Sequence, residues 1–201
     1  MSDFPVALHG ERITAVVVGG GSVGTRKALA LADAGAQVVV IAPEATPELE
    51  TAHKARRVSL VRERYQAKQL ERATLVVAAT DSREVNAQIA VDANARGKLV
   101  NVSDFPDEGN FHTMALHRSG DITIAVSSGG VPGAAARIRD AIAGRFDTRY
   151  ERAVSALRGL RSRLIASGDD RWREVAPELV GDDFCESVED GTFAERMDSW
   201  G

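Results

Sequence analysis

The 201-residue chain contains a single cysteine, Cys185. It therefore cannot form an intrachain disulfide or a metal cluster held by several thiolates, and it fits a reducing compartment. Aromatic residues make up only 5% of the chain, and no cluster of Lys and Arg is interleaved with them. Both observations argue against a nucleic-acid-binding surface. No apolar run approaches the ~18 residues of a membrane span, and residues 1–12 are too polar for a signal peptide. We therefore expect a soluble, cytoplasmic protein without a resident metal ion and without a membrane or a nucleic acid as partner.

The net charge of −4 is distributed unevenly along the chain. From residue 169 onward there are 11 acidic and three basic side chains, a balance of −8, which leaves +4 for residues 1–168. The positive part could attract an anionic ligand, although ordinary solvated faces account for most such charges. Segment 182–190 is acidic and poor in packing groups, so we expect it to be partly mobile.

A glycine-rich turn is the most informative feature that is present. A β-branched run beginning at Ile13 ends in Gly19-x-Gly21-x-x-Gly24, and a helix-forming stretch follows at residues 25–34. In this context Gly19 permits a sharp turn, Gly21 lets the backbone approach a pyrophosphate, and Gly24 lets the helix pack close to the sheet. Unpaired amides in the first helical turn then hold an anionic dinucleotide, the alternative being a tight turn without a ligand. The predicted cofactor-binding residues of this turn are Gly19, Gly21, Ser22, Val23 and Gly24.

Strands and helices alternate through the first half of the chain. The apolar runs at 37–41, 58–61, 74–79 and 99–102 predict strands, and residues 46–57 and 83–96 predict helices. This alternation predicts a parallel sheet with crossover helices, covered on both faces because the runs lack a period of two. A loop at 101–110 ends this pattern, and a second module follows with strands at 111–117 and 121–126 and helices at 134–146, 149–165 and beyond Trp172.

Three segments in this order resemble the precorrin-2 dehydrogenase family, the dehydrogenase part of siroheme synthases: residues 17–28 (VVGGGSVGTRKA), 101–106 (NVSDFP) and 124–130 (IAVSSGG). The resemblance covers roughly residues 1–160 and implies NAD-dependent oxidation of precorrin-2 to sirohydrochlorin on a homodimer. It implies an α/β fold in which a Rossmann-type parallel sheet is followed by a small α+β dimerisation region and a C-terminal helical domain. The expected boundaries are 1–110 for the NAD-binding domain, 111–147 for the dimerisation region and 148–201 for the helical domain.

Asp104 is the predicted catalytic residue. Removing two hydrogens from a tetrapyrrole requires a hydride acceptor and a base for the proton. Asp104 follows the fifth predicted strand, at the carboxyl edge where open parallel sheets bind ligands, and it matches the Asp of the family's Asn-Val-x-Asp segment. The alternative is a turn-forming Asp before Phe-Pro.

The Ser-Ser-Gly-Gly segment is a candidate cradle for the carboxylates of the substrate, because hydroxyls and backbone amides precede a helix there. The predicted substrate-binding residues are Ser127, Ser128, Gly129 and Arg137. The alternative is a helix N-cap with glycines easing the turn, and Arg137, like Arg118 and Arg139, could be a solvated surface charge.

The residues after the second and fourth strands bear on the cofactor. Ile41 is followed by Ala42-Pro43 where NAD-specific proteins usually have an acidic residue, and Glu44, 20 residues past Gly24, is the nearest substitute. No Arg stands at 42–46 to accept a 2′-phosphate, which favours NAD over NADP. We therefore assign Pro43 and Glu44 to one side of the cofactor, and Thr80 and Asp81 to the other, with Asp81 alternatively capping the next helix.

Other roles stay open at this stage. His112 and His117 are expected on opposite faces of one strand, which makes them poor joint metal ligands, and a structural role is the more common one for such a histidine. One alternative function is a chelatase that inserts Fe²⁺ or Co²⁺ into sirohydrochlorin, alone or together with the dehydrogenase. Another is a regulatory module that senses NAD and needs no base.

Overall fold

The computed structural model describes residues 3–200, which divide into two compact units at residues 113 and 114. Unit 1 contains the parallel sheet, and unit 2 contains a hairpin and the C-terminal helices; each is described by itself. Among the helices of the described residues, none combines the length and the apolar character that crossing a membrane requires.

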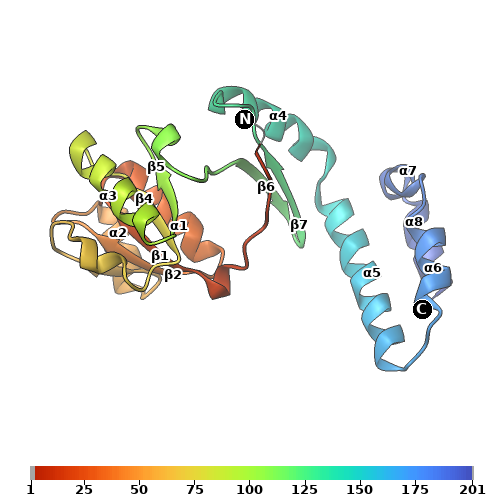
Figure 1. The fold of residues 1–201 in the computed structure, drawn as a ribbon. Helices are drawn as coiled ribbons and strands as arrows, with labels where there is room; N and C mark the ends of the chain where they lie inside the picture. Colours follow the sequence, from red (N-terminus) through yellow and green to blue (C-terminus); the bar gives the residue numbers. More distant parts are fainter. Residues whose placement is uncertain (1–2, 201) are drawn as a thin grey trace. The chain divides into compact units, whose positions relative to one another are not determined.

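Unit 1 is built on a five-stranded parallel sheet with the strand order β3-β2-β1-β4-β5 (Figure 1). Its strands are β1 (Thr14–Val18), β2 (Gln37–Ile41), β3 (Ser59–Val61), β4 (Leu75–Ala78) and β5 (Leu99–Val102). Val18, the last residue of β1, pairs with Ile41 of β2 on one side and with Ala78 of β4 on the other. The strand order reverses at β1, so the crevice at the carboxyl ends of β1 and β4 is where a sheet of this topology binds ligands. The predicted Rossmann-like fold class is confirmed.

Helices cover both faces of this sheet. Alternate residues of the central strands point to opposite faces, and they pack into two different apolar clusters. Ala15 and Val17 pack with residues of α1 and α2, whereas Val16 and Val18 pack with residues of α3. The helices of unit 1 are α1 (Ser22–Asp33), α2 (Pro47–Lys54) and α3 (Arg83–Ala95), with short 3-10 helices at Gly10–Arg12, Ala67–Leu70 and Pro106–Glu108.

Unit 2 begins with an antiparallel hairpin and continues as helices. Its elements are β6 (Ala115–Ser119), β7 (Ile122–Val126), α4 (Pro132–Arg145), α5 (Thr148–Ala166), α6 (Trp172–Leu179), α7 (Phe184–Asp190) and α8 (Thr192–Asp198). The helix α4 packs against the hairpin, and α5 packs against the three short helices that follow it (Figure 1). The core of this helical part contains Tyr150, Leu160 and Phe193, and the rings of Phe184 and Phe193 meet edge to face at 5.4 Å.

Several predicted boundaries are wrong, each for a local reason. The first hairpin strand begins at Ala115 rather than at 111, because Phe111 is bonded to β5: its N–H donates to Val100 O and its carbonyl accepts from Asn101 Nδ2. The second helix ends at Lys54 rather than at 57, since Arg56 adopts a left-handed φ of 58°. The first helix begins at Ser22 rather than at 25, because Gly21 is its N-cap.

Most of the acidic segment 182–190, which was expected to be partly mobile, forms the helix α7. Val188 of this helix is buried in the core of unit 2, because one face of the helix is apolar. Gly191, with φ +92°, ends α7 and starts α8, and the helical pattern predicted beyond Trp172 is divided among the three short helices α6, α7 and α8.

Candidate active site

The glycine turn between β1 and α1 is tightly packed from two sides. Gly19 has a φ of +120°, and a Cβ at this position would lie 2.1 Å from the carbonyl oxygen of Ala79. A Cβ on Gly24 would lie 2.1 Å from the carbonyl oxygen of Gly19. Since real Cβ atoms do not approach oxygen so closely, both positions accept only glycine without movement of the backbone. The turn therefore fixes how close α1 and the end of β4 lie to the end of β1.

Gly21 has a different environment, because a Cβ there would meet nothing within 4 Å. It is the N-cap residue of α1, with φ −73° and ψ −175°, and no side chain caps the helix. The amides of the first helical turn have no partner within the helix and carry a partial positive charge. Ser22 and Val23, which begin this turn, are exposed. The open space and the uncapped amides fit the phosphates of a dinucleotide.

Gly20 is a residue of this turn that the sequence analysis missed. A Cβ on it would lie 2.1 Å from the carbonyl oxygen of Glu44, and its own carbonyl accepts a hydrogen bond from Thr46 N at 3.0 Å. The run of three glycines was the available signal in the sequence. The atom that requires a glycine at position 20, Glu44 O, belongs to another loop. Gly20 thus brings Pro43 and Glu44, both exposed on the loop after β2, next to the glycine turn.

A partly buried hydrogen bond joins the same two segments. Thr25, only 2% exposed, lies one turn into α1, and its Oγ1 is 2.8 Å from Thr46 Oγ1. Thr46 Oγ1 also accepts from Leu49 N at 3.2 Å and so caps α2. The first helix and the loop after β2 are therefore joined beside the open space at Gly21.

The loop after β4 is organised by Asn86 of α3, whose side chain is 1% exposed. Asn86 Oδ1 accepts from Thr80 N at 3.0 Å and from Thr80 Oγ1 at 2.7 Å, and Asn86 Nδ2 donates to Thr80 O at 3.1 Å. Asp81 is exposed and does not cap α3, contrary to the alternative considered for it. The cap is Ser82, whose Oγ accepts from Val85 N at 3.3 Å, because the helix begins at Arg83.

Asp104 lies two residues beyond the end of β5 and is exposed. Its Oδ1 accepts a hydrogen bond from Asn86 Nδ2 at 3.0 Å, so this contact runs to α3 rather than to the backbone of its own turn. Ser103 N donates to Ala78 O at 2.9 Å and holds the start of the loop against β4. Arg83 is close by: its pKa is raised by its hydrogen bond to Glu108 and further by the charges of Glu108 and Asp104.

Unit 1 therefore brings three predicted groups to one edge of the sheet. Thr80 N would lie 3.0 Å from a Cβ on Gly19, Asp104 shares Asn86 with Thr80, and Glu44 contacts the turn through Gly20. This arrangement can hold an anionic cofactor next to a carboxylate base.

The predicted substrate-binding residues Ser127, Ser128, Gly129 and Arg137 all belong to unit 2. Gly129 and Gly130 are left-handed, with φ of +58° and +92°, and Arg137 is exposed on α4. The alternative of a serine N-cap is wrong, because α4 begins at Pro132, two residues before its predicted start, and its N-cap is Val131. Ser128 Oγ instead donates to Val131 O and closes the turn before the helix.

The two histidines do not share a strand, contrary to the prediction. His112 precedes β6, and its Nε2 is 3.8 Å from Asp3 Oδ2. His117 lies in β6, and its Nε2 is 2.6 Å from the carbonyl oxygen of Phe146 just after α4, a contact that ties the hairpin to this helix. Within residues 3–200, no group of three or more His, Cys, Asp or Glu side chains could hold a metal ion.

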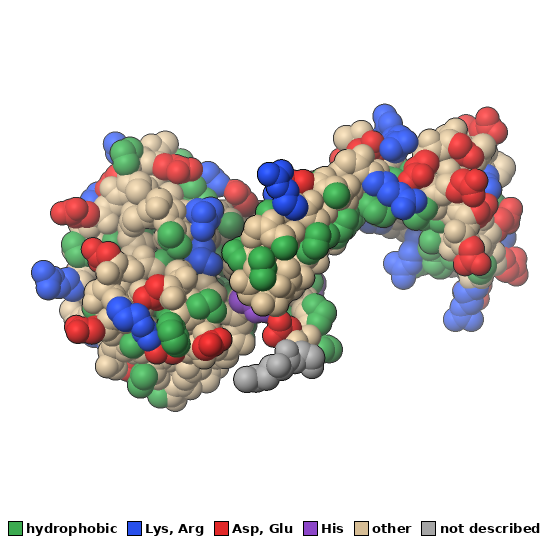
Figure 2. Space-filling view, turned by 90° about the horizontal axis from the view of Figure 1, so that it is seen from above, with side chains coloured by type: hydrophobic (Ala, Val, Ile, Leu, Met, Phe, Trp, Pro, Cys, Tyr) green, Lys and Arg blue, Asp and Glu red, His purple; other side chains and the backbone are tan. Residues whose placement is uncertain are grey.

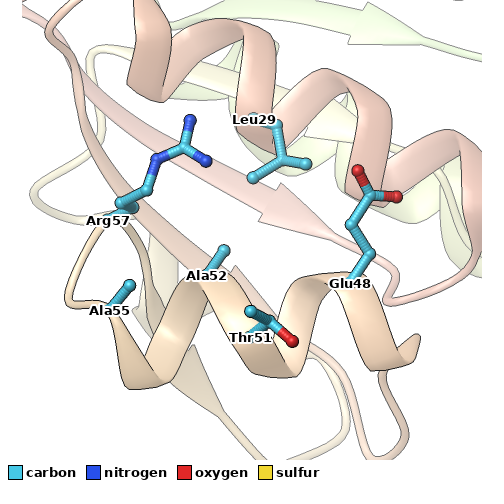
Figure 3. A pocket seen from close by; sticks show the side chains of 6 residues that line it. All are labelled: Leu29, Glu48, Thr51, Ala52, Ala55 and Arg57. Atoms are coloured by element: carbon cyan, nitrogen blue, oxygen red, sulfur yellow. The ribbon is translucent and has the colours of Figure 1, made fainter.

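Two cavities lie elsewhere. One, of about 260 Å³, lies between α1 and α2, where Glu48 and Arg57 flank Leu29 (Figure 3). The other, of about 510 Å³, lies in unit 2 along α5, α7 and α8. Neither is lined by a predicted site residue.

Comparisons with known proteins point to one family. Residues 6–115 match the family model described as "Putative NAD(P)-binding". The siroheme synthase of Chromobacterium violaceum is 36% identical over 199 residues, 98% of this chain and 41% of that protein. The siroheme synthase of Pseudomonas fluorescens is 34% identical over 190 residues, 94% of this chain and 39% of that protein. The chain thus spans about two fifths of the length of these curated relatives.

A solved structure has the same fold. The protein titled "SirC, precorrin-2 dehydrogenase" superposes with a TM-score of 0.79 at 23% identity, covering 98% of this chain and 100% of that one. At this identity the likeness shows the arrangement of strands and helices.

Proposed function

The chain belongs to the NAD(P)-binding family whose model its residues 6–115 match, and we propose that it oxidises precorrin-2 to sirohydrochlorin with NAD as hydride acceptor and Asp104 as general base. The observation that carries the proposal is the shared edge of the sheet. There the uncapped amides of α1, Thr80 and Asp104 follow the carboxyl ends of β1, β4 and β5. The siroheme synthases that the chain resembles support the choice of tetrapyrrole.

The reaction removes two hydrogens from the substrate as a hydride and a proton. A bound nicotinamide supplies the acceptor for the hydride. The chain supplies the rest: the amides after Gly21 bind the phosphates, and Asp104 removes the proton. Because Asp104 Oδ1 already accepts from Asn86, we assign the proton to Oδ2.

We assign NAD rather than NADP on the charge of the loop after β2. Glu44 is exposed next to the glycine turn, where a carboxylate accepts hydrogen bonds from the two hydroxyls of an adenosine ribose. A 2′-phosphate at the same place would meet this negative charge, and residues 42–46 contain no Arg to offset it.

We assign the carboxylates of the substrate to the loop and helix of unit 2. The exposed amides around Gly129 and Gly130, the hydroxyls of Ser127 and Ser128, and the forked guanidinium of Arg137 are all suited to carboxylates. Binding would draw the hydroxyl of Ser128 away from Val131 O, its present acceptor.

We further propose a homodimer that covers the apolar side of α4. Val131 and Ile138 of this segment are 57% and 48% exposed, and Leu116 of the hairpin is 43% exposed. Figure 2 shows hydrophobic side chains gathered along α4, and a second copy of the chain with the same surface would remove them from water.

The test mixes the purified full chain with enzymatically made precorrin-2 and NAD without oxygen, and follows the pigment spectrum and NADH absorbance together. We expect both to change in step. Asp104→Asn should fold and bind NAD but lose roughly 100-fold or more in turnover, the usual contribution of a general base. Asp107→Asn, which neutralises an exposed carboxylate in the same loop, is the matched control and should stay active.

Each part of the proposal has its own contrary result. Full turnover in Asp104→Asn would remove this residue from the mechanism. NAD binding without any tetrapyrrole-dependent NADH would favour the NAD-sensing module. A divalent metal added after the oxidation tests for chelatase activity in the same cuvette.

A further inference from the structure

Asn86 is a buried polar side chain in an otherwise apolar part of α3. Ile89, Ala90 and Ala93 of the same helix pack into the cluster beneath the sheet, and Asn86 is as buried as they are, at 1% exposure. Burying an amide costs free energy unless its hydrogen bonds are replaced. An apolar residue would fill the space without this requirement, so the hydrogen bonds of the amide are the feature to explain.

The amide of Asn86 uses its whole hydrogen-bonding capacity. Its Oδ1 accepts two bonds, from Thr80 N and Thr80 Oγ1, and its Nδ2 donates two, to Thr80 O and Asp104 Oδ1. Because the backbone N–H of Thr80 can only donate, the amide oxygen must face Thr80, and a flipped side chain is excluded. The N–H directed at Asp104 is therefore fixed in place by three bonds to another loop.

This arrangement joins two segments that the proposed reaction needs together. Thr80 follows β4 on the side assigned to the cofactor, and Asp104 follows β5 as the assigned base. Without Asn86, the exposed Asp104 would sample several rotamers on a surface loop. A reacting group displaced by about 1 Å can cost on the order of 100-fold in rate.

We infer that Asn86 is a positioning residue of the dehydrogenase, which holds the carboxylate of Asp104 at a fixed place relative to the cofactor side of the site. The inference rests on the proposed function. Asn86 touches neither cofactor nor substrate in this role and acts through Asp104.

The test compares Asn86→Asp with Asn94→Asp in the full-length protein. Asn86→Asp has the same shape and still accepts from Thr80 N and Thr80 Oγ1, but it loses the donor to Asp104 and to Thr80 O and places a second carboxylate beside Asp104. Asn94→Asp makes the same chemical change on an exposed position of the same helix, where the amide donates to Glu108 O and not to Asp104. Asn86→Ser removes the donor without adding a charge and serves if the first variant does not fold. The measurements are kcat and KM for precorrin-2, the Kd for NADH, and the melting temperature.

We expect kcat per folded molecule to fall about 100-fold in either Asn86 variant, with little change in KM or in the Kd for NADH. In an Asp104→Asn background, Asn86→Asp should change the residual turnover by less than about twofold, because the two residues act as one unit. Asn94→Asp should keep the kcat of the wild type, because its amide donates to Glu108 O and not to Asp104.

Three results would overturn the inference. If the wild type is active and both Asn86 variants keep its kcat, Asn86 has only a structural role and the proposed function stands. If the defect is confined to the Kd for NADH, Asn86 serves Thr80 alone. If the wild type itself forms no NADH with precorrin-2, the proposed function and this inference fail together.

Discussion

Gly21 and Gly24 lie in the same turn, but the same substitution should lower stability only at Gly24. In Gly24→Ala, the new methyl would lie 2.1 Å from Gly19 O, and about 3.4 Å is needed for ordinary van der Waals contact. The helix must therefore move by more than an ångström or the turn must open. In Gly21→Ala, the methyl meets nothing within 4 Å at an ordinary φ of −73°.

The expected magnitudes follow from these contacts. Overpacking costs about 1–3 kcal/mol, and the better helix propensity of Ala returns up to about 1 kcal/mol, so Gly24→Ala should lose about 2 kcal/mol of stability. This lowers the melting temperature of unit 1 by about 8 °C. In Gly21→Ala, a less flexible unfolded chain and a poorer N-cap each contribute about 0.5–1 kcal/mol in opposite directions, so stability should change little.

Cofactor affinity should fall in both variants, for different reasons. The methyl of Gly21→Ala occupies the open space in front of the uncapped amides, so we expect NADH to bind about tenfold more weakly, a loss of about 1.4 kcal/mol. Gly24→Ala should lose affinity as well, because the amides move with the helix.

The assay is calorimetric melting together with titration of NADH, since both tryptophans of the chain lie in unit 2 and do not report on this turn. Unchanged NADH affinity in Gly21→Ala would refute the placement of the phosphates. An unchanged melting temperature in Gly24→Ala would refute the packing argument.

Two further predictions concern stability. Thr25→Val keeps the shape of the side chain but removes its hydrogen bond to Thr46, and urea unfolding should show a loss of about 1 kcal/mol, whereas Thr51→Val on the exposed side of α2 should change stability by less than about 0.5 kcal/mol. The pKa of Glu189 is lowered by hydrogen bonds from Arg145 and then from Tyr150, so its stabilisation is present above the ordinary value of 4.5 and is lost as the pH falls through the depressed pKa. Tryptophan fluorescence, which reports on unit 2, should therefore show a urea midpoint that falls in this acid range, less steeply in Glu189→Gln; a midpoint independent of pH would contradict the assignment.

Local sequence was sufficient for the sheet and for one part of the site. The predicted strands at 37–41 and 99–102 have the bounds of β2 and β5, because short runs rich in Val and Ile encode a strand covered on both faces. The spacing of Gly19, Gly21 and Gly24 likewise predicted a strand-to-helix turn, since close backbone contacts leave a signature in residue size. Elements whose bounds depend on distant partners were predicted less well. The first hairpin strand is an example: it begins only at Ala115, because Phe111 is hydrogen-bonded to β5.

The sequence by itself determined the alternating α/β pattern, the glycine turn and Asp104 as a carboxylate just beyond a strand, because these depend on residues adjacent in the chain. Only the tertiary structure shows that a side chain on Gly20 would collide with Glu44 O, and that Asn86 joins Thr80 to Asp104. Both depend on loops that follow different strands, and only the parallel sheet brings the ends of those strands to one edge. The physical reason is that the hydrogen-bonding partner of a buried amide depends on which strands are neighbours in the sheet. The order of the strands along the sequence does not give their order in the sheet.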